Sequence, residues 1–237
     1  MKSVELSDIE SVLPLKTWWA MLFVLPLSRR LTRYVVNNTS LSPNLITGVG
    51  LLLRLITGVC FFYGSIFLFW VGAFSFFAAY VCDCTDGAVA RLTGKASEFG
   101  RYLDHISDLV GDVLILISLS YSVGLIDQVW IWAMVYMHVA ECYISYLSGF
   151  AFKAHRGGGG ELFLFRLFND YRQFFFSRNI KSFFSFPDYT AIVFIVFPVL
   201  GFPELGLRVG FCLLLMIVFY TVLSTFVSLH TDERRFP

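Results

Sequence analysis

Six stretches of apolar residues, joined by short connections except between the fourth and the fifth, occupy most of this sequence after residue 43. A helix needs about 20 apolar residues to cross a bilayer. Only 15% of the residues are charged, whereas soluble domains carry about a quarter, so too little charge is present to cover a soluble core. The sequence therefore predicts an all-α integral membrane protein with six transmembrane helices. The expected spans are 44–64, 66–90, 101–123, 128–150, 188–202 and 205–229.

Two further segments complete a single membrane-embedded domain over residues 1–237. Residues 18–36 are apolar at first and then basic, which predicts an amphipathic helix at the membrane interface, preceding the six-helix core of 44–229. Residues 151–187 form a longer, aromatic-rich and basic connection, which we expect to be a cytoplasmic loop. Its four consecutive glycines favour a flexible joint over an anion-binding nest.

The placement of basic residues predicts the orientation. Of the 18 lysines and arginines, all except Arg54 and Arg208 fall on or beside the side that carries both chain ends and the 91–100 and 151–187 connections. The positive-inside rule places that side in the cytoplasm. We therefore expect both termini and the most polar part of the chain to face the cytoplasm. A net charge of +1 and low charge content exclude a nucleic-acid-binding surface.

Acidic side chains are costly within apolar spans, so they indicate function. Asp83 and Asp86 end the second span, and Asp104 and Asp108 begin the third. Because these spans form a hairpin through a short connection, we expect the four carboxylates to converge near the cytoplasmic end. Such a group requires compensating positive charge. Hard divalent cations with oxygen ligands, Mg²⁺ or Mn²⁺, suit it better than zinc, since no histidine or cysteine set has zinc spacing.

Small and basic residues accompany these acids. Gly87, Ala90 and Gly100 let a bulky nucleotide lie close to the backbone, and Arg91 can bind a phosphate through two parallel hydrogen bonds. Two metal ions beside such a pocket would suit a diphosphate. The same acids could instead form the ion path of a cation transporter. The spacing alone leaves both interpretations open.

The pattern from Asp83 to Asp108 resembles the signature of the CDP-alcohol phosphotransferase family. It reads Asp-x-x-Asp-Gly-x-x-Ala-Arg, eight residues, then Gly-x-x-x-Asp-x-x-x-Asp, and every fixed position is present. Pro43-Asn44-x-x-Thr47 is similar to the family's usual entry into its first core helix. The resemblance covers little of the chain beyond these two segments.

The resemblance implies a reaction and a set of roles. A CDP-linked donor would pass its phosphoalcohol group to the hydroxyl of a polar alcohol acceptor, with release of CMP. Two ions, Mg²⁺ or Mn²⁺, would be bound by Asp83, Asp86, Asp104 and Asp108, and Asp108 would also be the general base. The residues implied to bind CDP are Asn44, Thr47, Asp83, Gly87, Ala90, Arg91 and Gly100. The family resemblance further implies a homodimer among membrane lipids.

Other polar residues have weaker assignments. Asn44 and Thr47 could equally form a helix cap beside Pro43. Possible acceptor-site residues are Arg101, His138, Glu141 and Arg156, although His138 and Glu141 could simply pair with each other. Within the third span, Asp112 is expected to neutralise Arg54 of the first span.

The compact length favours transfer of a phosphatidyl group from CDP-diacylglycerol. The alternative within the family is transfer of phosphocholine or phosphoethanolamine from a small CDP-alcohol to diacylglycerol. A transporter would distribute its acids through the membrane depth, whereas the signature acids gather near one face. An inactive scaffold is disfavoured by the intact signature. The sequence leaves the acceptor open.

Overall fold

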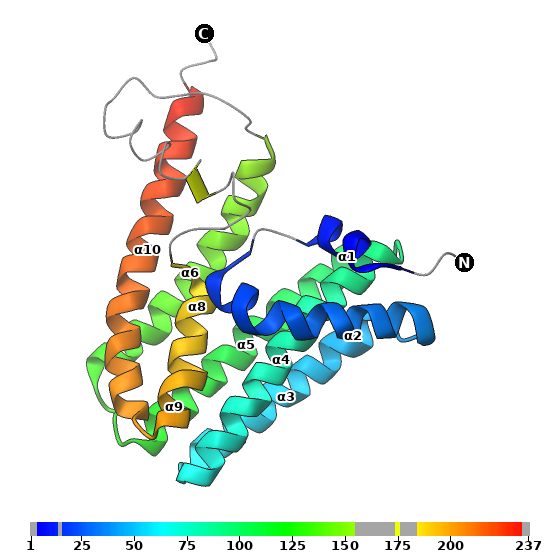
Figure 1. Cartoon of the computed structure of the whole chain (residues 1–237). Coiled ribbons are helices and arrows are strands. Elements are labelled where there is room, and N and C mark those ends of the chain that lie inside the picture. The colour runs from blue at the N-terminus through cyan, green and yellow to red at the C-terminus, as the bar shows by residue number, and fades with distance from the viewer. Residues whose placement is uncertain (1–3, 14–15, 155–173, 176–183, 234–237) are drawn as a thin grey trace.

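The computed structural model describes residues 4–13, 16–154, 174–175 and 184–233. The described part of the chain is almost entirely helical (Figure 1). Two short helices, α1 (Leu6–Val12) and the π-helix η1 (Ala20–Val24), precede α2 (Leu25–Asn38). The long helices are α3 (Pro43–Tyr63), α4 (Ile66–Leu92), α5 (Glu98–Ser122), α6 (Val129–Ala154) and α10 (Pro203–Glu233). Between α6 and α10 lie α8 (Phe186–Ala191), the π-helix η2 (Ile192–Val196) and α9 (Phe197–Leu200).

The predicted spans coincide with helices to within a few residues. Among the described residues, three helices are long and apolar enough to cross a membrane: Pro43–Tyr63, Ile66–Leu92 and Pro203–Phe226. Residues Phe186–Leu200 form a shorter apolar helix. The count of six spans stays a prediction. Most of the predicted 151–187 loop lies outside the described residues, and α6 continues past the predicted boundary at 150.

Helices begin and end where the local sequence supplies caps. Ser42, Ser65 and Ser97 precede α3, α4 and α5, and the side chain of each accepts a hydrogen bond from a backbone N–H of the first turn. Gly64 ends α3 with a φ of 67°, in the left-handed region that glycine tolerates. The connection between α3 and α4 is therefore tight, and the two helices pack along each other.

The α3–α4 contact is close because small residues and hydroxyl groups line it. A Cβ atom on Gly72 would lie 2.5 Å from the Phe61 ring, so only glycine fits there. Thr57 donates to the Gly72 carbonyl at 3.1 Å, and Ser75 donates to the Leu53 carbonyl at 2.8 Å. Small residues and interhelical hydrogen bonds are the usual means of association between helices in membranes. The α3–α4 pair, with α5 packed against α3, makes a three-helix frame.

The second half of the chain packs beside this frame. α10 lies along α6, and η2 contacts both α4 and α10 (Figure 1). The main buried core gathers aromatic and aliphatic side chains from both halves, including Phe61, Phe76, Ile115, Phe194 and Leu214. The Trp70 indole donates to the Val199 carbonyl at 3.0 Å and ties α4 to α9.

The N-terminal segment crosses the frame, with α2 lying against α4 (Figure 1). Residues 18–38 are helical. The amphipathic interfacial helix expected over 18–36 stays a prediction. The sequence prediction missed α1, whose Glu10 forms ion pairs with Lys16 and Arg29. The backbone N–H of Trp19 donates to Asp188 at 2.7 Å, which anchors this segment to the start of α8.

Candidate active site

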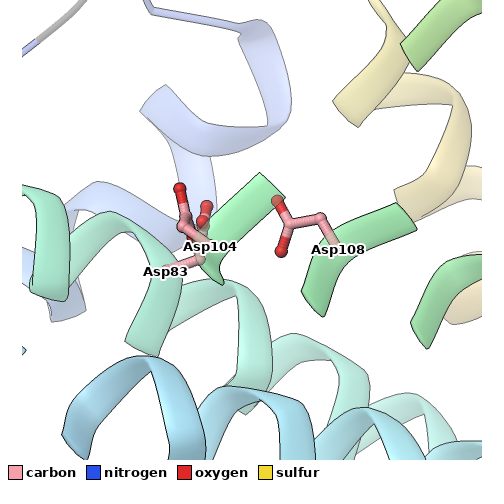
Figure 2. A group of neighbouring side chains, drawn as sticks. All are labelled: Asp83, Asp104 and Asp108. Atoms are coloured by element: carbon pink, nitrogen blue, oxygen red, sulfur yellow. The ribbon is translucent and has the colours of Figure 1, made fainter. Parts of the chain in front are cut away.

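Three carboxylates converge between α4 and α5. Asp83 comes from α4, and Asp104 and Asp108 come from successive turns of α5. One oxygen from each lies within 4.8 Å of the others, and all three side chains are half-buried. Figure 2 shows the Asp108 carboxylate directed toward those of Asp83 and Asp104. The predicted convergence is thus present for these three residues.

The hairpin geometry brings them together. α4 ends at Leu92, Gly94 turns the chain with a φ of 67°, and Ser97 caps the start of α5. Asp104 and Asp108 are four residues apart and share one face of α5. Both helices pack against α3, and the carboxylates of this α5 face come within 4.8 Å of the Asp83 carboxylate of α4.

Asp86 lies apart from this group. Its carboxylate accepts a hydrogen bond of 2.5 Å from the Thr47 hydroxyl of α3, and its side chain is buried. Thr47 therefore contacts a signature aspartate and does not cap the helix. Ser42 is the N-cap of α3, so Asn44 does not form the helix cap either.

A cavity of about 390 Å³ opens beside Asp86. Its lining includes Asn44, Thr47, Gly87, Ala90, Arg91 and Gly100, so the structure brings together all the predicted CDP-binding residues except Asp83. Asp104 and Arg101 line it as well. The sequence interpretation missed Pro43, Lys95, Ala96, Ser97 and Glu98. Pro43 was interpreted only as the start of the first core helix. The other four residues lie in the spacer between the two halves of the signature, where the signature fixes no residue type.

Glycines keep this cavity open. A Cβ atom on Gly100 would lie 3.2 Å from the Asn44 side-chain oxygen, and one on Gly87 would lie 3.2 Å from the Arg91 guanidinium. Arg91 thus folds back over Gly87 at the cavity wall. Larger side chains at either position would displace polar groups that face the cavity.

A second cavity, of about 320 Å³, also adjoins the carboxylates. Asp83 and Asp108 line it, together with Arg54, Tyr80, His105, Asp112, Ser145 and Thr190 among others. Asp104 lines only the first cavity and Asp108 only the second, as far as the described residues show. The group of Asp83, Asp104 and Asp108 therefore borders both cavities.

Arg54 crosses from α3 to the acidic face of α5. Its Nε lies 3.2 Å from Asp112 Oδ1, which confirms the predicted neutralisation of Arg54 by Asp112. Its Nη2 lies 2.6 Å from Asp108 Oδ1. The contact with Asp108 was not predicted, because that residue had been assigned to the metal site.

The predicted acceptor-site residues are dispersed. Arg101 forms an ion pair with Glu98 and lines the first cavity. His138 is fully buried, with Nδ1 3.4 Å from the Tyr189 hydroxyl. Glu141 accepts hydrogen bonds of 2.9 Å from Ser145 and from Thr221. Among the described lining residues of the two cavities, neither His138 nor Glu141 appears. Arg156 lies outside the described residues.

Comparison with known proteins identifies the family. The family model for CDP-alcohol phosphatidyltransferases matches residues 40–229, which is most of the chain and includes the whole site. The chain belongs to the CDP-alcohol phosphatidyltransferase family. With its long apolar helices, this membership indicates an integral membrane protein.

Two curated relatives of this phosphatidyltransferase family member are 30% identical to it. One is archaetidylinositol phosphate synthase from Pyrococcus horikoshii, over 122 residues, 52% of this chain and 60% of that protein. The other is a probable CDP-diacylglycerol–inositol 3-phosphatidyltransferase from Arabidopsis thaliana, over 110 residues, 45% of this chain and 47% of that protein. The alignments thus span about half the length of these relatives.

A solved structure shares the fold. It is the phosphatidylinositol phosphate synthase PgsA1 of Mycobacterium tuberculosis in complex with manganese and citrate. The sequences are 21% identical, the match covers 87% of this chain and 88% of that one, and the TM-score is 0.51. In the present family member, the group of Asp83, Asp104 and Asp108 offers only carboxylate oxygens. This donor set fits Mg²⁺ or Mn²⁺ and not a nitrogen- or sulfur-bound metal.

Proposed function

We propose that this protein transfers a phosphatidyl group from CDP-diacylglycerol to the hydroxyl of a polar alcohol and releases CMP. The observation that supports this proposal most directly is the carboxylate group bordering two cavities. A transferase of this kind must hold a donor and an acceptor on opposite sides of the phosphorus atom for in-line displacement. Family membership restricts the donor to a CDP-linked molecule.

The first cavity is assigned to the CDP part of the donor. Arg91 faces it and binds a phosphate, while Gly87 and Gly100 leave room for the nucleotide near the backbone. Asn44 and Thr47 bring α3 to the same wall. The second cavity is assigned to the acceptor hydroxyl, with Asp108 at its edge.

Asp83, Asp104 and Asp108 would hold two divalent ions, with Asp86 completing the set from the nucleotide side. Their oxygen-only donor set and mutual proximity support this assignment. When bound, the ions would neutralise the negative charge on the diphosphate and on the leaving phosphate oxygen. The manganese in the related PgsA1 structure is consistent with Mn²⁺ as one choice.

The protein side chains account for the remaining chemistry. The acceptor oxygen forms a bond to the phosphatidyl phosphorus as the bond from that phosphorus to the CMP oxygen breaks. The hydroxyl proton moves to the Asp108 carboxylate, which lies at the second cavity. CMP leaves through the first cavity.

The test is a release assay with purified protein. Labelled CDP-diacylglycerol and Mg²⁺ or Mn²⁺ are incubated with serine, glycerol 3-phosphate, inositol or inositol phosphate, and CMP is measured. Both curated relatives are named for inositol-type products, so the inositol acceptors are tested first. We expect CMP release with one acceptor above the rest. Release only from CDP-choline or CDP-ethanolamine with diacylglycerol would overturn the choice of donor.

The proposal extends to the whole chain. Residues 1–237 would form one membrane-embedded domain with six spans, an interfacial helix over 18–36 and a homodimeric assembly. The site and both termini would face the cytoplasm, as the basic residues predict. A reporter fused at the C-terminus that is active only outside the cytoplasm tests this orientation, and we expect it to be silent.

A further inference from the structure

Arg54 is the only charged residue between Pro43 and Tyr63, the fully described helix α3, and its side chain is 6% exposed. Two acidic side chains of α5 contact it through different nitrogen atoms: Asp112 through Nε at 3.2 Å and Asp108 through Nη2 at 2.6 Å. The contact with Asp112 is a hydrogen bond, whereas the contact with Asp108 is a close ion pair without hydrogen-bond geometry. The planar guanidinium group bridges the two carboxylates, which the compact ammonium group of a lysine cannot do in the same geometry.

The burial of the three groups is graded. The side chains of Arg54 and Asp112 are 6% and 9% exposed, whereas that of Asp108 is 35% exposed. Asp112 already balances the charge of Arg54. The contact of Arg54 with Asp108, at 2.6 Å, is nevertheless the shorter of the two, so the guanidinium group is shared between both acids.

The backbone of α5 makes room for this arrangement. A Cβ atom on Gly111 would lie 2.5 Å from Arg54 Cδ and 3.0 Å from Arg54 Cβ. Arg54 thus passes directly over a bare turn of α5 to reach Asp108. Any larger residue at position 111 would push the Arg54 side chain away from both carboxylates.

We propose that Arg54, fixed by Asp112, is a positioning residue that holds the Asp108 carboxylate toward Asp83 and Asp104. Arg54 Nη2 lies 2.6 Å from Asp108 Oδ1, and the Asp108 carboxylate is directed toward the other two acids (Figure 2). Partners that orient a metal-binding side chain typically change metal affinity or activity by about 10–100-fold when removed. This inference rests on the proposed function of Asp108.

The primary test is Arg54→Lys, which keeps the positive charge but removes the planar guanidinium group. Mn²⁺ binding is measured by electron paramagnetic resonance on purified protein without substrates. We expect the affinity to fall by about 10–100-fold and kcat to fall in the same range, with KM for CDP-diacylglycerol within about threefold. The split between kcat and KM separates positioning of Asp108 from damage to the nucleotide cavity.

A second variant avoids a buried unpaired charge. Arg54→Met with Asp112→Leu replaces the pair by apolar side chains of similar volume, a change that buried ion pairs often tolerate. It should unfold near the wild-type temperature and still show the loss of Mn²⁺ affinity. The matched control is Glu204→Gln with Arg208→Gln, which removes an exposed pair at the start of α10 and should change neither property.

Three outcomes would overturn the inference. Wild-type Mn²⁺ affinity in folded Arg54→Lys and in the double variant would show that the pair only neutralises charge. Tighter Mn²⁺ binding would show that Arg54 competes with the metal for Asp108. Absence of Mn²⁺ binding by the wild-type protein would remove the site itself. Mn²⁺ binding without transfer from CDP-diacylglycerol would instead refute the proposed function and leave the role of Arg54 intact.

Discussion

Gly111→Ala is the smallest change that should disturb the candidate active site without touching an acid. The added Cβ atom would lie 2.5 Å from Arg54 Cδ, whereas unstrained carbon atoms stay about 3.5–4.0 Å apart. Arg54 lies between two helices and cannot simply swing into solvent. Overpacking of this kind costs about 1–3 kcal/mol.

Helix propensity acts in the opposite direction, because alanine is favoured over glycine by up to about 1 kcal/mol inside a helix. The net loss of stability for Gly111→Ala is therefore about 0–3 kcal/mol. Gly48→Ala on α3 provides the matched control, since no heavy atom lies within 4 Å of the added Cβ atom. Gly48→Ala should gain up to about 1 kcal/mol, and the difference between the variants, about 1–3 kcal/mol, isolates the clash with Arg54.

Unfolding in mixed detergent micelles, followed by tryptophan fluorescence, measures this difference. Mn²⁺ affinity is measured on the same samples. We expect Gly111→Ala to weaken Mn²⁺ binding by about tenfold, in line with the effect of losing an orienting partner, and Gly48→Ala to leave it unchanged. If the two variants have equal stability and equal Mn²⁺ affinity, the close packing of Arg54 against Gly111 does not help to orient the Asp108 carboxylate.

Three further predictions concern the proposed reaction. Asp108→Asn should lower kcat by about 10²–10⁴-fold, the usual contribution of a general base, while direct titration shows that CDP-diacylglycerol still binds; wild-type turnover would exclude Asp108 as the base. Thr47→Val removes the 2.5 Å hydrogen bond to Asp86, and a hydrogen bond to a charged group contributes about 1.5–3 kcal/mol. KM for the donor should therefore rise about tenfold or more, whereas Thr57→Val on the same helix should leave KM unchanged. Incubation with a chelator should abolish CMP release and added Mn²⁺ should restore it, and full activity after exhaustive chelation would contradict the metal assignment.

The positions of the long helices could be predicted because apolar runs and their polar interruptions are local features. Ser65 and Ser97 cap helices that begin close to the predicted boundaries. The helix α1 escaped prediction for the opposite reason. Its placement depends on contacts distant in sequence, such as that of Glu10 with Arg29 and the hydrogen bonds between Val4 and Asn37.

Helix geometry also explains why Asp86 stands apart. Residues three apart, such as Asp83 and Asp86, share a helix face only approximately, because three residues advance a helix by about 300° and leave a 60° offset. That offset directs Asp83 toward α5 and Asp86 toward Thr47 on α3. Sequence spacing identified the acids but could not assign each to its neighbour, since the neighbouring helix is set by packing.

Under the proposed function, the first cavity binds the donor and the second binds the acceptor. The wall of the first includes several signature positions, among them Gly87, Arg91 and Gly100, so the signature identifies the nucleotide-linked donor. The wall of the second adds side chains outside the signature, among them His105, Ser145 and Thr190 from α5, α6 and α8. Substitutions in these three should therefore change the preference among acceptors while the donor KM stays constant. The acidic residues bordering the cavities serve both substrates, because the phosphorus atom must be reached from the two sides at once.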